Sequence, residues 1–495
     1  STLTTDDRIE CDVVIVGSGA GGAALAYQLV NAGLAVVVLE GGKYLKRRDF
    51  GGRPAHLAAR AYVDKGLSFS IGNLGAPIWA GRTVGGSTTI NSGTCYRAPD
   101  RVLRSWQDRG LSMLGPDALS PYYERVESML QVEPAQSDQL GVVASIVARG
   151  AERMGLSHGP LDRNAPGCDG QGQCCFGCPT GAKRSADVSW IPEALKRGVM
   201  LYASTQVERI ETEGGRADGR RAVGLVARTA GGARLAVRAR ATVIAGGALL
   251  TPVLLEQSEL CRGSGWLGRN LSIHPAGKVL GLFDERVDQW RGIPQSYTID
   301  QFKDEGLLFE GGSTPFSVTA VALPFFGPRF MEAMERYPHL ANFGFMIEDT
   351  SRGRVRRRPG GGPLITYNLN DRDTLRMKRG LEVLSEVFLR AGARAVFPGI
   401  IGLDELRSEA DLARMRAMKL PADRLEVTAF HPLGTARMGI DAAESVVGPD
   451  HETHDVRDLF VVDGSVMPGP LGVNPQMTIM AMALRAGDVL ARRLS

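Results

Sequence analysis

The segment between Asp12 and Glu40 constrains the fold most, because it carries no charged side chain between these two ends. Residues 11–17 (CDVVIVG) are typical of a buried strand, the glycine-rich turn GSGAGG follows, and residues 23–33 continue as a helix. Residues 34–40 (LAVVVLE) form a second apolar run. None of these units is long enough to cross a bilayer. The pattern therefore predicts a βαβ unit in which two parallel strands are joined by a helix.

The turn of this unit fits the spacing G-x-G-x-x-G through Gly17, Gly19 and Gly22. The first glycine permits the turn, the second lets backbone approach a pyrophosphate, and the third lets the helix pack close to the strand. The helix N-terminus then offers free N–H groups to phosphates. Glu40, at the end of the second strand, can accept hydrogen bonds from a ribose diol. We predict a dinucleotide site, with NAD and FAD both open at this point.

Length and charge limit the remaining classes. A chain of 495 residues is expected to hold two or more hydrophobic cores, and 62 glycines imply many tight turns or close backbone approaches. The 58 basic and 54 acidic residues leave a net charge of only +4, which does not suggest a nucleic-acid partner. The basic run in SRGRVRRRPGGGP (351–363) is interpreted as a solvated strand and its turn. The residues before the βαβ unit lack the positive bias of a secretory leader, so we expect a soluble, cytoplasmic chain without a membrane span.

A second glycine-rich segment, AGRTVGGSTTINSGTCYR (80–97), is suited to laying backbone N–H groups along a planar polar ligand. It resembles the flavin-contacting segment of the glucose-methanol-choline (GMC) oxidoreductases. Further resemblances to this family are VIAGGALLTPVLLEQSEL (243–260), GRNLSIHP (268–275), FHPLGTARMG (430–439) and LFVVDGSVMPGPLGVNPQMTIMAMAL (459–484). The middle of the chain, roughly residues 276–425, matches only loosely.

The resemblance implies an α/β protein with a discontinuous Rossmann-like FAD-binding domain and a sheet-rich α+β substrate-binding domain. The expected FAD-binding domain comprises residues 1–275 and 426–495, with residues 100–200 partly on the substrate side. The expected substrate-binding domain comprises residues 276–425. FAD contacts are expected from Gly17, Gly19, Gly22, Glu40, Gly85, Gly86, Ser87, Asn91, Gly93, Thr94, Val207, Asp463, Gly464, Pro475 and Met477. Some family members attach the flavin through a histidine where this chain has Ile90, so we expect non-covalent FAD.

The catalytic candidates are His431 and Asn474. Oxidation of an alcohol by hydride transfer requires a hydride acceptor, a base and a group that holds the substrate oxygen. Imidazole titrates near neutral pH, and the resemblance places the base at His431. An amide donates without titrating, so Asn474 is expected to position the oxygen. We also interpret Asn474 as the N-cap of a helix whose first position is Pro475.

Four cysteines lie in the loop GCDGQGQCCFGCPTGAKRS (167–185). Certain GMC dehydrogenases hold an iron–sulfur cluster in a comparable loop, for which Cys168, Cys174 and Cys178 are the possible ligands here. Asp169 stands where their pattern has a second cysteine, so we favour reduced structural thiols and expect no metal. A disulfide framework is not expected in a chain of this size.

Other features have simpler interpretations. HETH (451–454) lacks the H-E-x-x-H spacing of zincins and is interpreted as a solvated loop, and His274 as a structural residue. Half of the sixteen phenylalanines gather in the expected substrate domain. If some of them line the cavity, an apolar or aromatic alcohol or a sterol suits the site better than a free sugar. These eight residues are Phe302, Phe309, Phe316, Phe325, Phe326, Phe330, Phe343 and Phe345.

The leading hypothesis is an FAD-dependent alcohol dehydrogenase or oxidase that converts a CH–OH group to an aldehyde or ketone. Its partners would be a small-molecule alcohol and an electron acceptor, either oxygen or a redox protein or quinone. One alternative is an FAD-containing lyase on the same scaffold. Another is a dehydrogenase subunit for a sugar-type substrate that passes electrons through an iron–sulfur cluster to a cytochrome.

Overall fold

The computed structural model describes residues 3–215, 219–323 and 325–495. The βαβ unit is confirmed. Strand β1 (Asp7–Val16) is followed by helix α1 (Ala20–Asn31) and strand β2 (Val36–Glu40), and the two strands pair in parallel. All residues of β2 and the three residues 13–15 near the carboxyl end of β1 are buried, as expected where strands are covered on both faces.

β1 and β2 belong to an eight-stranded sheet that collects segments from three distant parts of the chain. The other strands are β7 (Met200–Ala203), β8 (Thr205–Glu213), β9 (Arg220–Thr229), β10 (Arg234–Ile244), β18 (Val456–Arg457) and β19 (Leu459–Val461). β10 runs parallel to β1 on one side and to β19 on the other. The C-terminal region thus completes a sheet that the N-terminal strand begins.

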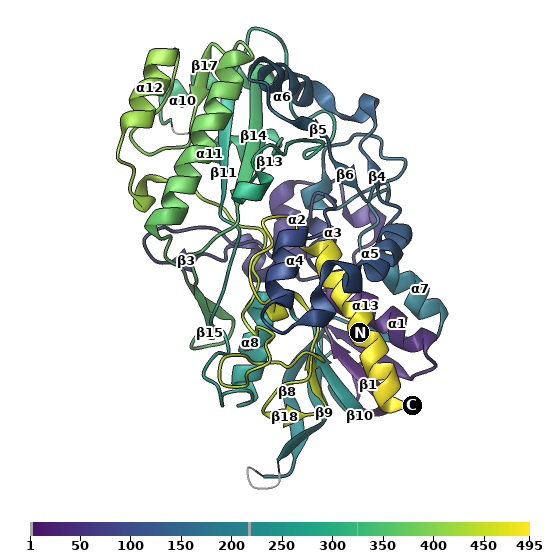
Figure 1. Ribbon diagram of the computed structural model, residues 1–495. Coiled ribbons are helices and arrows are strands. Elements are labelled where there is room, and N and C mark those ends of the chain that lie inside the picture. Colours follow the sequence, from purple (N-terminus) through teal and green to yellow (C-terminus); the bar gives the residue numbers. More distant parts are fainter. Residues whose placement is uncertain (1–2, 216–218, 324) are drawn as a thin grey trace.

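Helices from distant parts of the chain cover this sheet. They are α1, α5 (Pro116–Leu130), α7 (Trp190–Lys196), α8 (Gly247–Gln257) and α13 (Gln476–Leu494). Figure 1 shows α13, in yellow, beside α1, in purple, and the two helices pack against each other. Their apolar residues share one core with the sheet.

A six-stranded antiparallel sheet lies in the other half of the molecule, at the top of Figure 1. Its strands are β5 (His158–Pro160), β11 (Ala276–Leu282), β12 (Tyr297–Ile299), β13 (Leu307–Gly311), β14 (Leu340–Ile347) and β17 (Ala395–Phe397). Helices α6 (Gly141–Arg153) and α11 (Asp371–Arg390) pack on it around a second core. The molecule thus combines a largely parallel sheet covered by helices with a second half built on an antiparallel sheet. This agrees with the α/β fold class and the sheet-rich second domain expected from the sequence.

A three-stranded sheet, β15 (Arg354–Arg357), β16 (Pro363–Thr366) and β3 (Ser70–Ile71), lies at the side. The basic run is therefore a strand followed by a glycine turn, as predicted. The remaining elements are α2 (Pro54–Ala61), α3 (Ser87–Ile90), α4 (Asp100–Gln107), β4 (Glu133–Pro134), β6 (Asp162–Arg163), α9 (Phe316–Ala322), α10 (Pro328–Glu335) and α12 (Glu409–Ala417). In the described part of the chain, no helix has both the length and the apolar character that a membrane crossing requires.

The interpretation of HETH as a solvated loop was wrong. His451 has no exposed surface and Thr453 is 4% exposed. The Nδ1 atom of His451 lies 3.0 Å from the carbonyl oxygen of Val461, and its backbone φ is +67°. The tight pairing of this segment with β19 buries it, so the histidine is part of the core.

Candidate active site

One large cavity of about 1690 Å³ lies between the two sheets and receives residues from the N-terminal unit, the six-stranded sheet and the C-terminal segment. Sites for drug-sized ligands are commonly about 300–1,000 Å³. The cavity therefore has room for a ligand as long as a dinucleotide together with a small substrate.

Most residues that the sequence predicted for FAD and substrate line this cavity. They are Gly17, Gly19, Glu40, Gly86, Ser87, Asn91, Gly93, Thr94, Val207, Asp463, Gly464, Pro475, His431 and Asn474. Gly22, Gly85 and Met477 do not line it. Gly22 packs against the turn, where an added Cβ would lie 2.1 Å from the oxygen of Gly17. Met477 is 1% exposed and belongs to the core beneath the site.

The glycines of the βαβ turn form a backbone cradle that side chains would fill. An added Cβ at Gly17 would lie 2.3 Å from the carbonyl oxygen of Ala245, and Gly17 has a φ of +104°. An added Cβ at Gly86 would lie 2.8 Å from the Cα of Gly19, so two glycine turns meet face to face. The N-terminus of α1 opens onto this cradle. The arrangement fits the phosphates of FAD, because free N–H groups and the helix dipole both favour anions.

Glu40 lies at the carboxyl end of β2, where a ribose is expected. Its Oε2 accepts hydrogen bonds from the backbone N–H and the hydroxyl of Ser18, at 3.0 and 2.7 Å. Its Oε1 accepts from the N–H of Gly42 at 2.7 Å. Burial raises the pKa of the Glu40 carboxyl, and these hydrogen bonds oppose that shift. The carboxylate is thus held at the cavity wall with lone pairs left for a diol.

Asp463 connects the C-terminal segment to the start of α8. Its Oδ2 accepts from the N–H of Gly247 at 2.8 Å and from the hydroxyl of Thr251 at 2.6 Å, and its Oδ1 accepts from the N–H of Ser465. Burial raises the pKa of this carboxyl as well. Asp463 therefore holds two backbone segments at the cavity in fixed relation.

The glycine-rich segment is held by two side chains that the sequence did not single out. Gln476, the first residue of α13, donates to the carbonyl oxygen of Thr94 at 2.8 Å and accepts from Asn91 at 2.8 Å. Lys183 is 1% exposed and donates through Nζ to three carbonyl oxygens, those of Thr89, Asn91 and Cys174. Burial lowers the pKa of Lys183. Both residues fix the loop from behind.

At the other end of the cavity His431 meets His274, whose Nδ1 lies 3.3 Å from the Nδ1 of His431. The Nε2 of His274 accepts hydrogen bonds from the N–H groups of Leu471 and Gly472, at 3.0 and 3.2 Å. An Nε2 that accepts carries no proton, so the proton of neutral His274 lies on Nδ1 and points at His431. Burial lowers the pKa of His431 to about 4, so its ring is neutral at physiological pH. His274, expected to be merely structural, orients the candidate catalytic ring.

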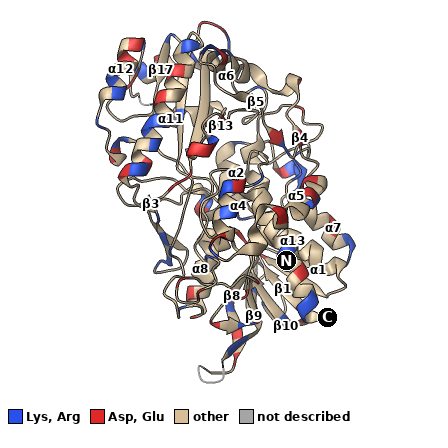
Figure 2. Cartoon of the chain, in the orientation of Figure 1, with Lys and Arg blue, Asp and Glu red and all other residues tan. Residues whose placement is uncertain are grey.

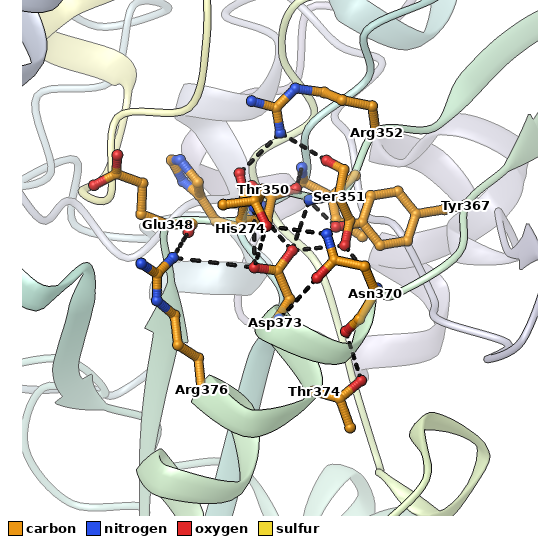
Figure 3. A network of polar contacts seen from close by, with 12 residues as sticks. His274, Glu348, Thr350, Ser351, Arg352, Tyr367, Asn370, Asp373, Thr374 and Arg376 are labelled. Atoms are coloured by element: carbon orange, nitrogen blue, oxygen red, sulfur yellow. Dashed lines mark hydrogen bonds and ion pairs between the residues drawn. The ribbon is translucent and has the colours of Figure 1, made fainter.

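The segment of His274 is held by a polar network in front of α11 (Figure 3). Asp349 accepts from the N–H of His274 at 3.3 Å and from the hydroxyl of Tyr367 at 2.7 Å. Asp373 accepts from the N–H groups of Thr350 and Ser351. Burial raises the pKa of Asp349 to about 6. Since buried networks of this kind are rigid when satisfied, the network fixes the backbone behind His431.

Asn474 does not cap the following helix, in contrast to the expectation. Helix α13 begins at Gln476 with Pro475 at the N-cap position. The Asn474 Nδ2 donates instead to Oε1 of Glu310 on β13, at 3.2 Å, while its Oδ1 has no partner among the described residues. Asn474 is thus a cavity residue and is freed from a capping role.

Glu310 is a further site residue that the sequence did not reveal. It is 6% exposed and lines the cavity, its Oε1 also accepts from Gln295 at 3.2 Å, and its Oε2 has no partner among the described residues. Burial raises the pKa of Glu310 to about 7. Nothing in a strand sequence LLFEG distinguishes a buried carboxyl from an exposed one. Its role depends on a contact with a residue 164 positions away.

The cysteine loop lies against the glycine-rich segment. All seven cysteines are free thiols. The Sγ of Cys175 lies 3.4 Å from the Oγ of Ser92, and Cys175 lines the cavity. In the described part of the chain no group of three or more His, Cys, Asp or Glu side chains is arranged to hold a metal ion. Cys174 Sγ accepts a hydrogen bond from Arg163.

Comparison with known families gives two matches along the chain. The N-terminal model of the GMC oxidoreductases matches residues 12–276, and the C-terminal model matches residues 349–483. Together these regions span well over half of the sequence.

Related proteins agree with these matches. An "uncharacterized GMC-type oxidoreductase" of Mycobacterium tuberculosis is 37% identical over 480 residues, covering 96% of this chain and 75% of that protein. A long-chain-alcohol oxidase of Arabidopsis thaliana is 29% identical, covering 98% of this chain and 70% of the oxidase. Among solved structures, pyridoxine 4-oxidase from Mesorbium loti has a TM-score of 0.73 at 21% identity, covering 97% and 98% of the two chains. A formate oxidase has a TM-score of 0.77 at 17% identity, covering 99% of each chain.

Proposed function

The chain belongs to the GMC oxidoreductase family, and we propose that it is an FAD-dependent enzyme that oxidises a CH–OH group to an aldehyde or ketone. The observation that carries this proposal is a single cavity in which a glycine cradle for phosphates continues into a pocket with His431 and Asn474. When bound there, FAD would supply the acceptor of a hydride. We propose that it is held without a covalent bond, since Ile90 stands where some relatives have histidine.

The residues of this chain have three tasks in such a reaction. The glycine turns around Gly17 and Gly86 would bind the pyrophosphate, and Glu40 the ribose. We propose the predicted cofactor residues that line the cavity, without His431 and Asn474, as the FAD contacts. We propose residues 1–275 and 426–495 as the flavin domain and residues 276–425 as the substrate domain. The substrate pocket would then lie where β13 and β14 approach the C-terminal segment.

We propose His431 as the general base and Asn474 as the group that holds the substrate oxygen. Its pKa of about 4 leaves the ring unprotonated, and so able to accept a proton, over the whole physiological range, and it also makes this imidazole a weaker base than one that titrates near neutrality. His274 donates from Nδ1 to the Nδ1 of His431, so the proton of neutral His431 lies on Nε2 in this structure. For Nε2 to accept the hydroxyl proton, that proton must first move to Nδ1 and the hydrogen bond from His274 must break, because two N–H groups cannot face each other at 3.3 Å. His274 thus sets the tautomer of His431.

Glu310 should control the pH dependence near neutrality. Its raised pKa means that the proton is bound below about pH 7 and is lost above it. The carboxylate accepts a stronger hydrogen bond from the Asn474 amide than the protonated acid does, and so holds that side chain more firmly. Flavin reduction in wild type should therefore rise with pH through about 7. Glu310→Gln should remove this limb while leaving the limb near pH 4 that belongs to His431. Stopped-flow flavin reduction between pH 5 and 9 measures both limbs.

The same substitution has an expected effect on stability. The pKa of Glu310 is higher in the folded protein than in the unfolded chain, so wild type loses stability as pH rises from about 4.5 to 7. A difference of this size corresponds to about 3 kcal/mol. Glu310→Gln should therefore raise the Tm relative to wild type at pH 8, and the difference should shrink steadily as the pH falls toward about 4. Equal Tm values at pH 8 would contradict the buried, titrating carboxyl.

The substrate proposal is an apolar alcohol of some length. The similarity to a long-chain-alcohol oxidase supports it, as does a cavity larger than a cofactor alone requires. The phenylalanine argument contributes little. Of the eight phenylalanines, only Phe345 lines the cavity, Phe309 and Phe343 are sheet core, and Phe326 is 91% exposed.

Anaerobic titration of the purified flavoprotein tests the proposal. Long-chain and aromatic alcohols should bleach the flavin absorbance, and free sugars should do so weakly or not at all. Reoxidation of the reduced protein with oxygen, a quinone or a dye then identifies the acceptor class. Purification without flavin, after reconstitution with FAD has also failed, would refute the proposal. Substrate turnover without bleaching would indicate the lyase alternative, and stoichiometric iron with acid-labile sulfide the cluster-bearing one.

A further inference from the structure

The three-stranded sheet β15–β16–β3 has an unusual distribution of polar and apolar side chains. On β3 and the residues before it, Ser68 and Ser70 are 5% and 4% exposed, whereas Leu67, Phe69 and Ile71 are 69%, 51% and 62% exposed. A half-buried strand normally turns its apolar side chains inward and its polar ones to water. Here the pattern is reversed along five successive residues, since the three apolar side chains face solvent and the two serines face inward. Packing in the core therefore does not account for the apolar side chains on the outside.

The register of the sheet extends this face across the other two strands. Ser70, Ile365 and Val355 lie opposite one another and are all buried, so they form the inner row. The outer row beside them joins Ile71 to Thr366 and Arg354. Because side chains alternate along a strand, Phe69, Leu364 and Arg356 belong to the same outer face.

The outer face therefore has an apolar column on β3 and a basic column on β15. The basic column contains Arg354, Arg356 and Arg358, and Figure 2 shows β15 as a blue strand near the label β3. Asp64 pairs with Arg358 at 3.3 Å, and Glu256 accepts from the backbone N–H of Arg357. In the described part of the chain, Arg354 and Arg356 have no carboxylate within ion-pair distance. The face is thus apolar on one side and net positive on the other.

The face is continuous with the mouth of the cavity. Leu67 and Gly72, at either end of the β3 segment, line the cavity, as do Arg358 and Pro363 from the turn between β15 and β16. Ile401, another exposed apolar residue at 56%, lines it too. A ligand that entered along this face would pass exposed apolar side chains before it reached the pocket.

We propose that the outer face of the β15–β16–β3 sheet docks reversibly on an anionic lipid surface and sets the cavity mouth against it. Apolar side chains that enter the interface and arginines that meet anionic headgroups are the two contributions that peripheral membrane binding combines. The arginine column argues for lipid over a second copy of this chain, because two copies would bring the same positive charges together. Docking itself does not depend on the proposed function. The delivery of a bilayer-dissolved alcohol to the site does rest on the proposed alcohol oxidation.

Flotation of the flavoprotein with vesicles tests docking in the absence of any substrate. Wild type should float with phosphatidylcholine vesicles that contain phosphatidylglycerol, less with pure phosphatidylcholine, and less in high salt. Phe69→Ser with Ile71→Thr should lower the partition coefficient at least about tenfold on both lipids. Arg356→Gln should lower it about fivefold, which corresponds to about 1 kcal/mol per cationic side chain, and only on the anionic vesicles.

The matched controls carry equally exposed side chains elsewhere. Met200→Thr with Ile440→Thr removes apolar residues that are 42% and 55% exposed, and Arg234→Gln removes an exposed arginine on β10. They should float like wild type. The proposal is wrong if wild type does not float, if the controls lose as much binding as the test variants, or if the test variants change only the oligomeric state in the absence of lipid.

A second measurement separates docking from chemistry. With a long-chain alcohol dissolved in the vesicles, flavin reduction in the Phe69→Ser, Ile71→Thr variant should slow in proportion to its lost binding. With a short soluble alcohol it should match wild type, because neither residue lines the cavity. Flotation without bleaching by any alcohol would leave docking in place and remove the proposed oxidation, and equal rates on vesicle substrate would remove delivery.

Discussion

Replacing His431 with alanine should slow anaerobic reduction of the flavin by an alcohol about 10²- to 10⁴-fold, the usual contribution of a general base. The ring lines the substrate end of the cavity and is neutral above about pH 5, because burial lowers its pKa to about 4. The loss should appear mainly in the rate constant of reduction at saturating alcohol. The amount of flavin bound should not change, since the phosphate cradle lies at the other end of the cavity. Stopped-flow absorbance at the flavin maximum gives both quantities.

Two comparisons distinguish proton transfer from a packing defect in this variant. Added imidazole should restore part of the rate in His431→Ala, with a dependence on the concentration of its neutral form. His56→Ala, which removes an exposed histidine, should reduce its flavin at the wild-type rate. A His431→Ala protein that bleaches as fast as wild type would show that the base is another group, and Glu310 would then be the first to test.

Replacing Gly17 with alanine should abolish the binding of FAD. The added Cβ would lie 2.3 Å from the carbonyl oxygen of Ala245, which is backbone of the neighbouring strand connection, and φ is +104°. Neither the strand end nor the α1 N-terminus can shift without opening the phosphate cradle. The purified variant should therefore contain little flavin and gain little on incubation with FAD. The ratio of flavin to protein absorbance measures this directly.

Gly33 provides the matched control for that experiment. It follows the same helix with a φ of +84°, but an added Cβ would meet nothing within 4 Å. Gly33→Ala should thus lose about 1–2 kcal/mol of stability from backbone strain and keep its flavin. Loss of flavin in both variants would mean that stability of the βαβ unit, and not the shape of the cradle, determines binding.

The sequence pattern within short stretches was sufficient to predict elements whose structure depends mainly on neighbouring residues. The βαβ unit and the basic strand near Arg354 follow from periodicity and glycine position within short windows, whereas the segment 243–260 was identified through the family resemblance. The convergence of distant segments on one flavin sheet followed from the family resemblance. Periodicity alone does not specify that β19 pairs with β10.

The side chains that the sequence did not reveal all act through contacts between distant segments. Glu310 sits in an ordinary apolar strand, and only its approach to Asn474 gives it a role. Lys183 looks like a surface residue of a polar loop until three carbonyl oxygens surround it. His451 was misread for the opposite reason, because a polar tetrapeptide became buried against β19. Burial of a polar group depends on tertiary partners, which a local window does not contain.

The two hydrogen bonds of Gln476 have a consequence for biosynthesis. They tie the glycine-rich segment near residue 91 to a helix that is synthesised 385 residues later. The first βαβ unit is therefore complete on the ribosome long before the residues that hold this segment in place have been made. We expect the pocket to become able to retain its prosthetic group only after α13 has been synthesised and has packed against this segment.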